Sequence, residues 1–385
     1  MPFSSNVEPT APGSRRPGRI DNTCSARLHD RALFSRLRLT ILAFGIPIVA
    51  GLVGCSAVKE GILAPRQPAS GPGGADYSHE SVLTQRFGDG ADEFWLFFPD
   101  HPRPETAPFV VFLHGWTAMN PRTYGAWIRH TVRKGHIVVY PRYQETTFDA
   151  PADMLAAASS AVAAAWSRAR DEGPVRPLPD KVVWIGHSLG GVLATLLAAD
   201  SGAIGLPPPA AVLSVEPGGQ DRLDLTDLRN LPSDTRVLLV VGEEDRVVGD
   251  EGAITLARTM THMPSGNVEM VTVRSDPRPV PALVANHIAP LAVAEGFPLD
   301  PETDAPGATR SRLRDRMAER RAREFVPDAL DFYGFWKLSD GLLDASFRDR
   351  NLDFAFGDTE RQRYMGRLSD GSLVPALLVS RPLDD

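Results

Sequence analysis

The sequence predicts an α/β fold in which a mostly parallel sheet carries helices on both faces. From about residue 80 onward, eight short β-like runs alternate with stretches that suit helices, which is the pattern of such a sheet. Several runs are apolar at successive positions, as buried parallel strands are. The chain has 385 residues, 43% of them hydrophobic and 23% charged. This balance allows a sizeable core and excludes collagen-like, coiled-coil and wholly disordered chains.

The eight runs begin with a hairpin and continue as buried strands. The first two are joined by Gly88-Asp89-Gly90, a composition typical of hairpin turns, so the sheet should start antiparallel. The expected strands are 81–87, 93–98, 109–113, 137–140, 181–185, 211–215, 236–241 and 268–273.

Four helices are expected between these strands. Residues 152–170 are rich in alanine, follow Asp149 and Pro151 as start signals, and end before Gly173-Pro174. The other helical stretches are 122–134, 189–200 and 251–260.

Residues 301–385 are expected to extend the same domain. The segment 301–324 alternates charges with almost no apolar face, which predicts a solvated helix or linker. A basic docking site for an anionic partner is the alternative, although acidic residues interrupt its arginines. Apolar side chains between Phe332 and Phe347 fall near helical spacing and predict a final helix packed on the sheet. Residues 356–379 indicate a surface hairpin.

The first 54 residues have the layout of a signal peptide. Residues 39–53 carry no charge and follow four arginines at positions 27–38. This run is shorter than the ~20 residues of a membrane-spanning helix. The next residues, Leu52-Val53-Gly54-Cys55, resemble the lipobox of bacterial lipoproteins. The resemblance implies cleavage before Cys55, lipidation of its sulfur and attachment to the extracytoplasmic face of a bacterial membrane. The alternative is an uncleaved apolar anchor with an incidental cysteine.

Residues 55–79 read as a flexible tether, because proline, glycine and serine dominate positions 64–74. Residues 80–300 would then form the main domain. Cys24 and Cys55 could pair in a disulfide, but the lipobox gives Cys55 another use.

Charge and motifs exclude several classes of partner. The net charge of −7 excludes a broadly basic surface for DNA or RNA. The sequence has no zinc- or calcium-binding spacing and no glycine loop that would cradle phosphates, so neither a metal nor another cofactor is expected.

The strongest chemical signal is a serine between a strand and a helix. The expected strand 181–185 runs into Gly186-His187-Ser188-Leu189-Gly190, a G-x-S-x-G motif, and then into the expected helix 189–200. A serine on so sharp a turn needs small neighbours two positions away on each side, and the two glycines supply them. Ser188 is therefore the candidate nucleophile. The alternative is a glycine-rich turn that only packs helix on strand.

With these residues the chain resembles the α/β-hydrolase family over roughly residues 80–300. The resemblance implies an oxyanion hole formed by the backbone N–H groups of Trp116, in His114-Gly115-Trp116, and of Leu189. His114 and His187 are expected to have structural roles.

The same resemblance orders the triad as serine, acid and histidine along the chain. Asp245, after the expected strand 236–241, matches the family's acid position, with Glu243, Glu244 and Glu216 as rivals. His287 is the one histidine after the expected strand 268–273, so it is the candidate base.

The expected activity is cleavage of carboxylic esters by a lipid-anchored serine hydrolase without a large lid domain. Only about 20 residues separate Val215 from Arg236, where the family often inserts a lid, so we expect an open site for small-molecule or polymeric esters. Trp116 is expected to wall the acyl pocket, and Tyr143 and Gln144 to lie near it. A peptidase, thioesterase, lipase, acyltransferase or catalytically silent binding lipoprotein stays open, because one triad or fold serves all of them.

Overall fold

The computed structural model of the chain describes residues 61–294, 297 and 325–384. The predicted signal peptide, Cys55 and the charged segment 301–324 lie outside the described residues. The described residues all belong to one compact unit.

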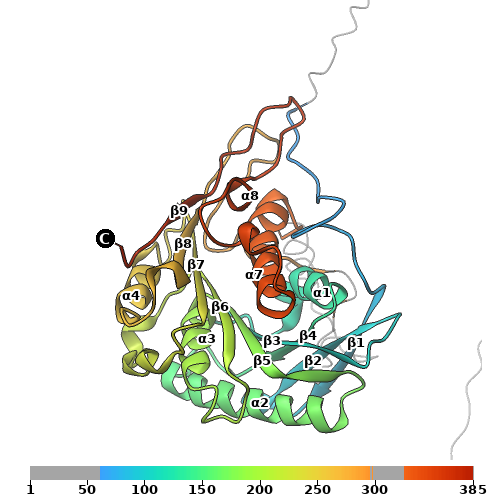
Figure 1. Cartoon of the computed structure of the whole chain (residues 1–385), viewed down its shortest axis with the longest axis vertical. Helices are drawn as coiled ribbons and strands as arrows, with labels where there is room; N and C mark the ends of the chain where they lie inside the picture. Colours follow the sequence, from blue (N-terminus) through green and yellow to red (C-terminus); the bar gives the residue numbers. More distant parts are fainter. Residues whose placement is uncertain (1–60, 295–296, 298–324, 385) are drawn as a thin grey trace, which may run out of the picture. The chain divides into compact units, whose positions relative to one another are not determined.

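A single sheet of nine strands, in the order β1-β2-β4-β3-β5-β6-β7-β8-β9, organises the described residues (Figure 1). Strands β4, β3, β5, β6, β7 and β8 are parallel to one another, while β1, β2 and β9 pair antiparallel with their neighbours. The strands are β1 (Ser81–Phe87), β2 (Phe94–Asp100), β3 (Thr106–Leu113), β4 (Ile137–Pro141), β5 (Arg176–His187), β6 (Pro209–Val215), β7 (Arg236–Gly242), β8 (Val268–Val273) and β9 (Leu378–Ser380).

The prediction of eight strands is therefore wrong by one. The additional strand, β9, is three residues long and pairs with the edge strand β8. Its short, partly exposed sequence carries no alternating pattern, so only the open edge of β8 identifies it as a strand. Strand β5 also begins five residues before its expected start. Two prolines hide this part, in which Arg176 and Pro177 pair with the start of β3.

Helices cover both faces of the sheet, as predicted. Residues of α2, α3 and α4 pack on one face, and residues of α1 and α7 pack on the other (Figure 1). The helices are α1 (Gly125–Arg133), α2 (Pro151–Glu172), α3 (Leu189–Ala199), α4 (Glu251–Thr259), α7 (Trp336–Arg348) and α8 (Glu360–Arg363). Six 3-10 helices are described: η1 (Gly90–Asp92), η2 (Pro121–Tyr124), η3 (Gln220–Arg222), η4 (Thr226–Asn230), η5 (Ser265–Asn267) and η7 (Leu352–Phe354). The segment η6 (Asp331–Phe335), directly before α7, is a π-helix. Within the described residues, we find no helix with both the length and the apolar character needed to cross a membrane.

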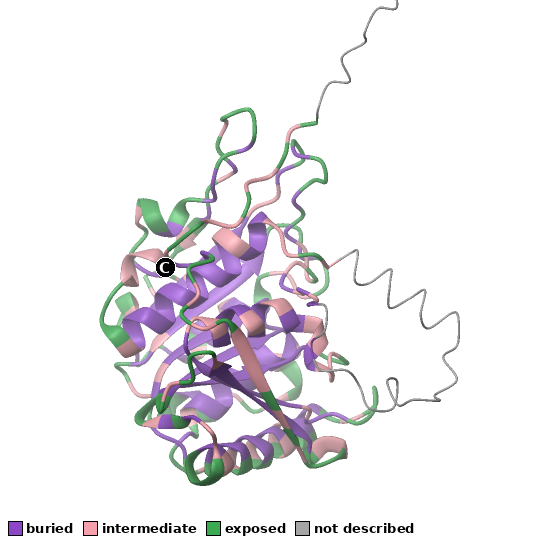
Figure 2. Ribbon diagram, turned by 90° about the vertical axis from the view of Figure 1, so that its right-hand side faces the viewer, coloured by how far each residue is buried: buried purple, intermediate pink, exposed green. Residues whose placement is uncertain are grey.

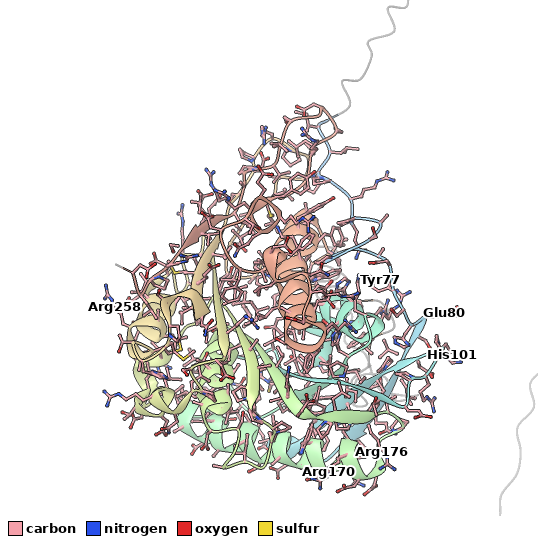
Figure 3. The ribbon with its side chains drawn as sticks, viewed as in Figure 1. Tyr77, Glu80, His101, Arg170, Arg176 and Arg258 are labelled. Atoms are coloured by element: carbon pink, nitrogen blue, oxygen red, sulfur yellow. The ribbon has the colours of Figure 1, made fainter. Side chains whose placement is uncertain are left out.

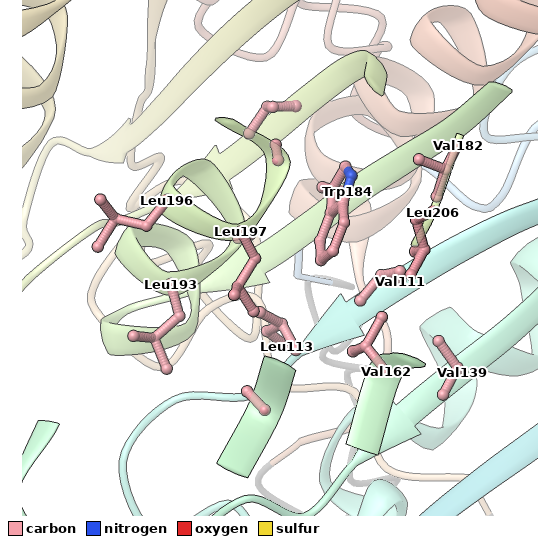
Figure 4. Close-up of a cluster of buried hydrophobic side chains, with 14 of the residues drawn as sticks. Val111, Leu113, Val139, Val162, Val182, Trp184, Leu193, Leu196, Leu197 and Leu206 are labelled. Atoms are coloured by element: carbon pink, nitrogen blue, oxygen red, sulfur yellow. The ribbon is translucent and has the colours of Figure 1, made fainter. Parts of the chain in front are cut away.

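The core lies in two layers, one on each face of the sheet. In the layer beneath α2 and α3, Trp184 of β5 packs among aliphatic side chains from neighbouring strands and both helices (Figure 4). All eleven residues of α3 except Ala199 are buried, so this helix sits fixed against the strands that flank Ser188. Burial at this level, about 25 cal/mol per Å² of apolar surface, anchors the elements that carry the site.

The predicted final helix is α7. Its residues from Trp336 to Ser346 are all buried (buried residues are purple in Figure 2), and it packs on the face that α1 also covers. The ammonium group of Lys337 is buried with it and donates to the carbonyl oxygens of Gln362 and Tyr364 at 2.6 and 2.7 Å. These bonds tie the C-terminal extension to the helix.

Residues 61–79 do not behave as the tether that their composition predicts. The N–H of Gly73 donates to Asp340 of α7 at 2.8 Å. The hydroxyl of Tyr77, which is labelled in Figure 3, bonds to Nδ1 of His130 on α1 at 3.1 Å. The partly buried Ile62 also packs on the second core layer. Composition fails here because the partners of Tyr77 and Gly73 lie 53 and 267 positions away in the sequence.

Candidate active site

Ser188 occupies a strained turn between β5 and α3. Its φ of +55° lies in the left-handed region, which non-glycine residues adopt at a cost of order 1–3 kcal/mol. The two glycines of the motif are required by space: a Cβ on Gly186 would lie 2.0 Å from the oxygen of Gly190, and one on Gly190 would lie 2.3 Å from that of His114. The motif thus positions the hydroxyl at the carboxyl end of the sheet.

His287 connects Ser188 with Asp245. Its Nε2 lies 2.9 Å from Oγ of Ser188, and its Nδ1 lies 2.8 Å from Oδ2 of Asp245. The other carboxylate oxygen of Asp245 accepts the N–H groups of Val247 and Val248 at 2.8 and 3.1 Å. Because Asp245 accepts at Nδ1, that nitrogen carries the imidazole proton and Nε2 is free to accept the serine proton.

The rival carboxylates lie in different environments. Glu243 turns toward the end of β8, where it accepts the N–H of Ser275 at 3.0 Å and pairs with Arg274. Glu244 is exposed. Glu216, directly after β6, is fully buried, and its Oε2 lies 3.6 Å from Nδ1 of His287. Asp245 is thus the acid bonded to the base, and Glu216 stands behind it.

The loop after β3 presents a free backbone N–H. Gln144 accepts the N–H of Thr117 at 2.7 Å, and Gly115 accepts that of Ala118 at 3.0 Å. In the described part of the chain, neither the N–H of Trp116 nor that of Leu189 has a hydrogen-bond partner. Two unpaired donors beside a serine are what a developing oxyanion requires. The buried Gln144 therefore braces this loop.

His114 has a structural position, held between the carbonyl oxygens of Gly115 and Arg142 at 2.7 and 2.6 Å. Its ring stacks on Tyr143 with the ring centroids 4.0 Å apart. Burial lowers the pKa of His114 to about 4, so the imidazole is neutral at pH 7.

His187 belongs to a hydrogen-bonded chain behind the triad. Its Nδ1 lies 2.8 Å from the hydroxyl of Tyr124, and its Nε2 lies 2.9 Å from the carbonyl oxygen of His287. Burial lowers the pKa of His187 to about 4. Tyr124 also accepts the N–H of Gly115 at 3.0 Å. Sequence reasoning did not single out Tyr124, because it sits in a helical stretch without a motif.

A metal site is one further arrangement to test. His187, Glu216 and His287 each place one potential ligand atom within 4.8 Å of the others. However, Nε2 of His187 bonds to the carbonyl oxygen of His287, and Nδ1 of His287 bonds to Asp245. Both histidine nitrogens that an ion would need are therefore already hydrogen-bonded, and the set fits a hydrogen-bonded network better than a metal site.

Comparison with known proteins agrees with this geometry. Residues 110–249 match the model of a family described as alpha/beta hydrolase fold. This chain has the α/β-hydrolase fold. The matched residues include the loop after β3, the Ser188 turn and Asp245, while His287 lies beyond them. No curated protein matches the chain. The α/β-hydrolase fold and the family match together indicate a hydrolase.

Proposed function

We propose that this protein is a serine hydrolase that cleaves carboxylic esters through an acyl-enzyme on Ser188. The observation that carries the proposal is the position of His287, whose two ring nitrogens lie 2.9 Å from Ser188 and 2.8 Å from Asp245. A nucleophile bonded to a base that is itself oriented by a carboxylate is the general pattern of nucleophilic catalysis.

Acylation begins when Oγ of Ser188 attacks the carbonyl carbon of the ester and its proton passes to Nε2 of His287. The imidazolium keeps its Nδ1 proton on Asp245, whose charge stabilises it. The carbonyl oxygen becomes negative, and the N–H groups of Trp116 and Leu189 stabilise that charge. The tetrahedral intermediate then expels the alcohol, which takes the proton from Nε2.

Deacylation reverses these roles with water as the nucleophile. His287 removes a proton from the water as it attacks the acyl carbon, and the same two N–H groups stabilise the second tetrahedral intermediate. Collapse of that intermediate returns the proton to Ser188 and releases the carboxylic acid.

The surface around the triad supports esters with accessible acyl or polymeric parts. Four loops at the carboxyl ends of the strands expose large apolar side chains, among them Trp116, Phe148, Val247 and Ile288. Between β6 and β7, the described chain forms only η3 and η4. The guanidinium of Arg222 in η3 lies 5.5 Å from the ring centroid of Trp116. An apolar substrate chain would bury these side chains on binding.

We further propose that the protein is exported and anchored to a bacterial membrane through lipid on Cys55. Support comes from the uncharged run 39–53 and the lipobox-like residues that follow it. Mass spectrometry of the membrane fraction tests this proposal. An acylated N-terminal peptide that begins at Cys55 is expected, and an unmodified N-terminus upstream of Cys55 would contradict it.

Labelling with a fluorophosphonate probe tests the hydrolase proposal. The wild-type protein should be labelled on Ser188 and should hydrolyse p-nitrophenyl esters, with Ser188→Ala losing both properties. Ser201→Ala, which changes a buried serine at the end of α3, is the matched control and should keep both. A folded wild-type protein that stays unlabelled contradicts a serine hydrolase. Labelling without turnover of short- or long-chain esters contradicts the ester assignment alone.

A further inference from the structure

The imidazole of His287 faces two carboxyl groups. Oδ2 of Asp245 lies 2.8 Å from Nδ1, and Oε2 of Glu216 lies 3.6 Å from the same atom. The shorter distance is a hydrogen bond and the longer one is not. Both carboxyl groups are buried, and they come from the ends of neighbouring strands, β7 and β6. A small rotation of the imidazole would therefore exchange one partner for the other.

The conformation and burial of Glu216 are both energetically unfavourable. Its φ of +47° is unfavourable for a residue with a side chain, and its Oε1 has no hydrogen-bond partner in the described part of the chain. Burial raises its pKa well above the usual value, His287 lowers it, and the charge of Asp245 raises it again. A buried carboxyl without a lysine or arginine partner normally reduces stability, so its presence here calls for a function.

The backbone makes room for this carboxyl group. A Cβ on Gly242, the last residue of β7, would lie 2.8 Å from Oε1 of Glu216 and 2.5 Å from the carbonyl oxygen of Ala285. A Cβ on Gly115 would lie 3.0 Å from Nδ1 of His187. Two glycines thus border the space that Glu216 and its partner His187 fill.

Hydrogen-bond direction fixes the proton on His187. The N–H of Gly115 can only donate, so the oxygen of Tyr124 accepts it and the hydroxyl proton points to Nδ1 of His187. Nε2 of His187 therefore carries the ring proton. That proton faces the carbonyl oxygen of His287 at 2.9 Å and Oε2 of Glu216 at 3.2 Å. This series of hydrogen bonds connects the oxyanion loop, at Gly115, with the backbone of His287.

We propose that Glu216 is a second positioning carboxyl for His287. It accepts from His187, which holds the backbone of the base, and it can accept from Nδ1 of His287 when Asp245 is absent. The assignment rests on the proposed hydrolase function. In the wild-type enzyme, Asp245 orients the imidazole and Glu216 acts mainly through His187. Without Asp245, Glu216 orients the imidazole directly.

The test is a double-mutant cycle with Glu216→Gln and Asp245→Asn, measured by ester turnover and by the rate of fluorophosphonate labelling. Glu216→Gln alone should lower kcat about threefold with KM nearly unchanged. Asp245→Asn should lower kcat by about 10³, less than the ~10⁴ seen where no second carboxyl is present. Adding Glu216→Gln to the Asp245→Asn variant should lower kcat by a further factor of about 30. This loss is about tenfold larger than the threefold loss from Glu216→Gln alone, and that ratio is the coupling between the two sites.

The pH profile separates this role from a merely structural one. In Asp245→Asn, activity should rise with pH through the ionisation of Glu216, and this limb should vanish in the double variant. The groups that face Glu216 are His187, His287, Tyr124 and, in the wild-type enzyme, Asp245. Glu243→Gln, at an exposed glutamate near the site, is the matched control and should behave as wild type.

The outcomes distinguish the inference from the proposed function. Equal effects of Glu216→Gln with and without Asp245, together with an unchanged pH profile, would overturn the role of Glu216 while leaving the hydrolase intact. Labelling without ester turnover contradicts only the ester assignment, because labelling rates still complete the cycle. A wild-type protein that is not labelled contradicts both proposals.

Discussion

The Nε2 atom of His187 donates to the carbonyl oxygen of His287 at 2.9 Å. The residue that precedes the nucleophile in sequence therefore holds the backbone of the base, which lies 100 positions away. The rings of the two histidines are also in contact, with their centroids 4.9 Å apart. Any change at His187 should thus act on the position of the catalytic imidazole rather than on the binding of substrate.

Replacing His187 by leucine should lower kcat by about 10- to 100-fold, because a displaced catalytic group loses up to about 10² in rate per ångström. KM should change little, since His187 is buried and lies behind the triad. Ester kinetics and the rate of fluorophosphonate labelling measure the effect. His187→Gln, whose amide can still donate, should recover part of the loss. A leucine variant that is labelled as fast as wild type would refute the role given to His187.

Replacing Gln144 by methionine should lower kcat by about tenfold, less than the 10²–10³ lost when an oxyanion donor is removed outright. The amide oxygen of Gln144 holds the N–H of Thr117 at 2.7 Å, next to the donor Trp116. Without this bond the loop can turn the Trp116 N–H away from the substrate. Burst kinetics with p-nitrophenyl esters measure the acylation step. Gln85→Met on β1 is the control, and an equal effect there would argue against the bracing role.

Sequence patterns predicted the parts of the fold and site that depend on local chemistry. Gly186 and Gly190 predict the turn at Ser188, because a Cβ at either glycine position would clash with the backbone. Apolar runs predict the buried strands. The loops that follow these strands bring the expected residues Ser188, Asp245 and His287 together. These signals are local in sequence, and each has a direct steric or hydrophobic cause.

The rest depended on contacts between distant residues. Nothing near Tyr124 indicates that its hydroxyl reaches His187, which lies 63 positions away. The family resemblance ranks Asp245 first as the acid, but only the structure shows that the rival Glu216 also faces His287. Strand β9 depends on the open edge of β8, and residues 61–79 depend on partners in α1 and α7.

Three buried histidines should each lower stability as the pH drops from about 6.5 to about 4. Burial lowers the pKa of His114, His136 and His187 to about 4. In this window the unfolded chain binds protons that the folded protein does not, so acid favours unfolding. His136 allows a test away from the triad. Its Nδ1 faces the carbonyl oxygen of Thr131, and the charge of Arg348 adds to burial in lowering its pKa.

Replacing His136 by phenylalanine should remove its share of that acid sensitivity. Relative to wild type, the variant should gain about 2 kcal/mol in free energy of unfolding between pH 7.5 and pH 4.5. Urea unfolding at the two pH values measures the gain. His262→Gln, at an exposed histidine, should show none. If the free energies of unfolding of wild type and His136→Phe differ by the same amount at both pH values, His136 is not held neutral.

Lys337 should make stability rise with pH on the alkaline side of neutrality as well. Burial in α7 lowers its pKa from 10.5 to about 7, although its ammonium donates to two carbonyl oxygens. Between these values the unfolded chain holds a proton that the folded protein has lost, so stability rises with pH. From pH 7 to pH 9 the free energy of unfolding should increase by about 2 kcal/mol.

Replacing Lys337 by methionine should abolish that rise, whatever its effect on stability at any single pH. Methionine keeps the length and apolar stem of lysine but has no titrating group. Urea unfolding at pH 7, 8 and 9 measures the slope, and Lys181→Met, at an exposed lysine, should keep the wild-type slope. A methionine variant with the wild-type slope would show that the Lys337 amine stays protonated in the folded protein. The carbonyl oxygens of Gln362 and Tyr364, which accept from the ammonium, would then stabilise its charge.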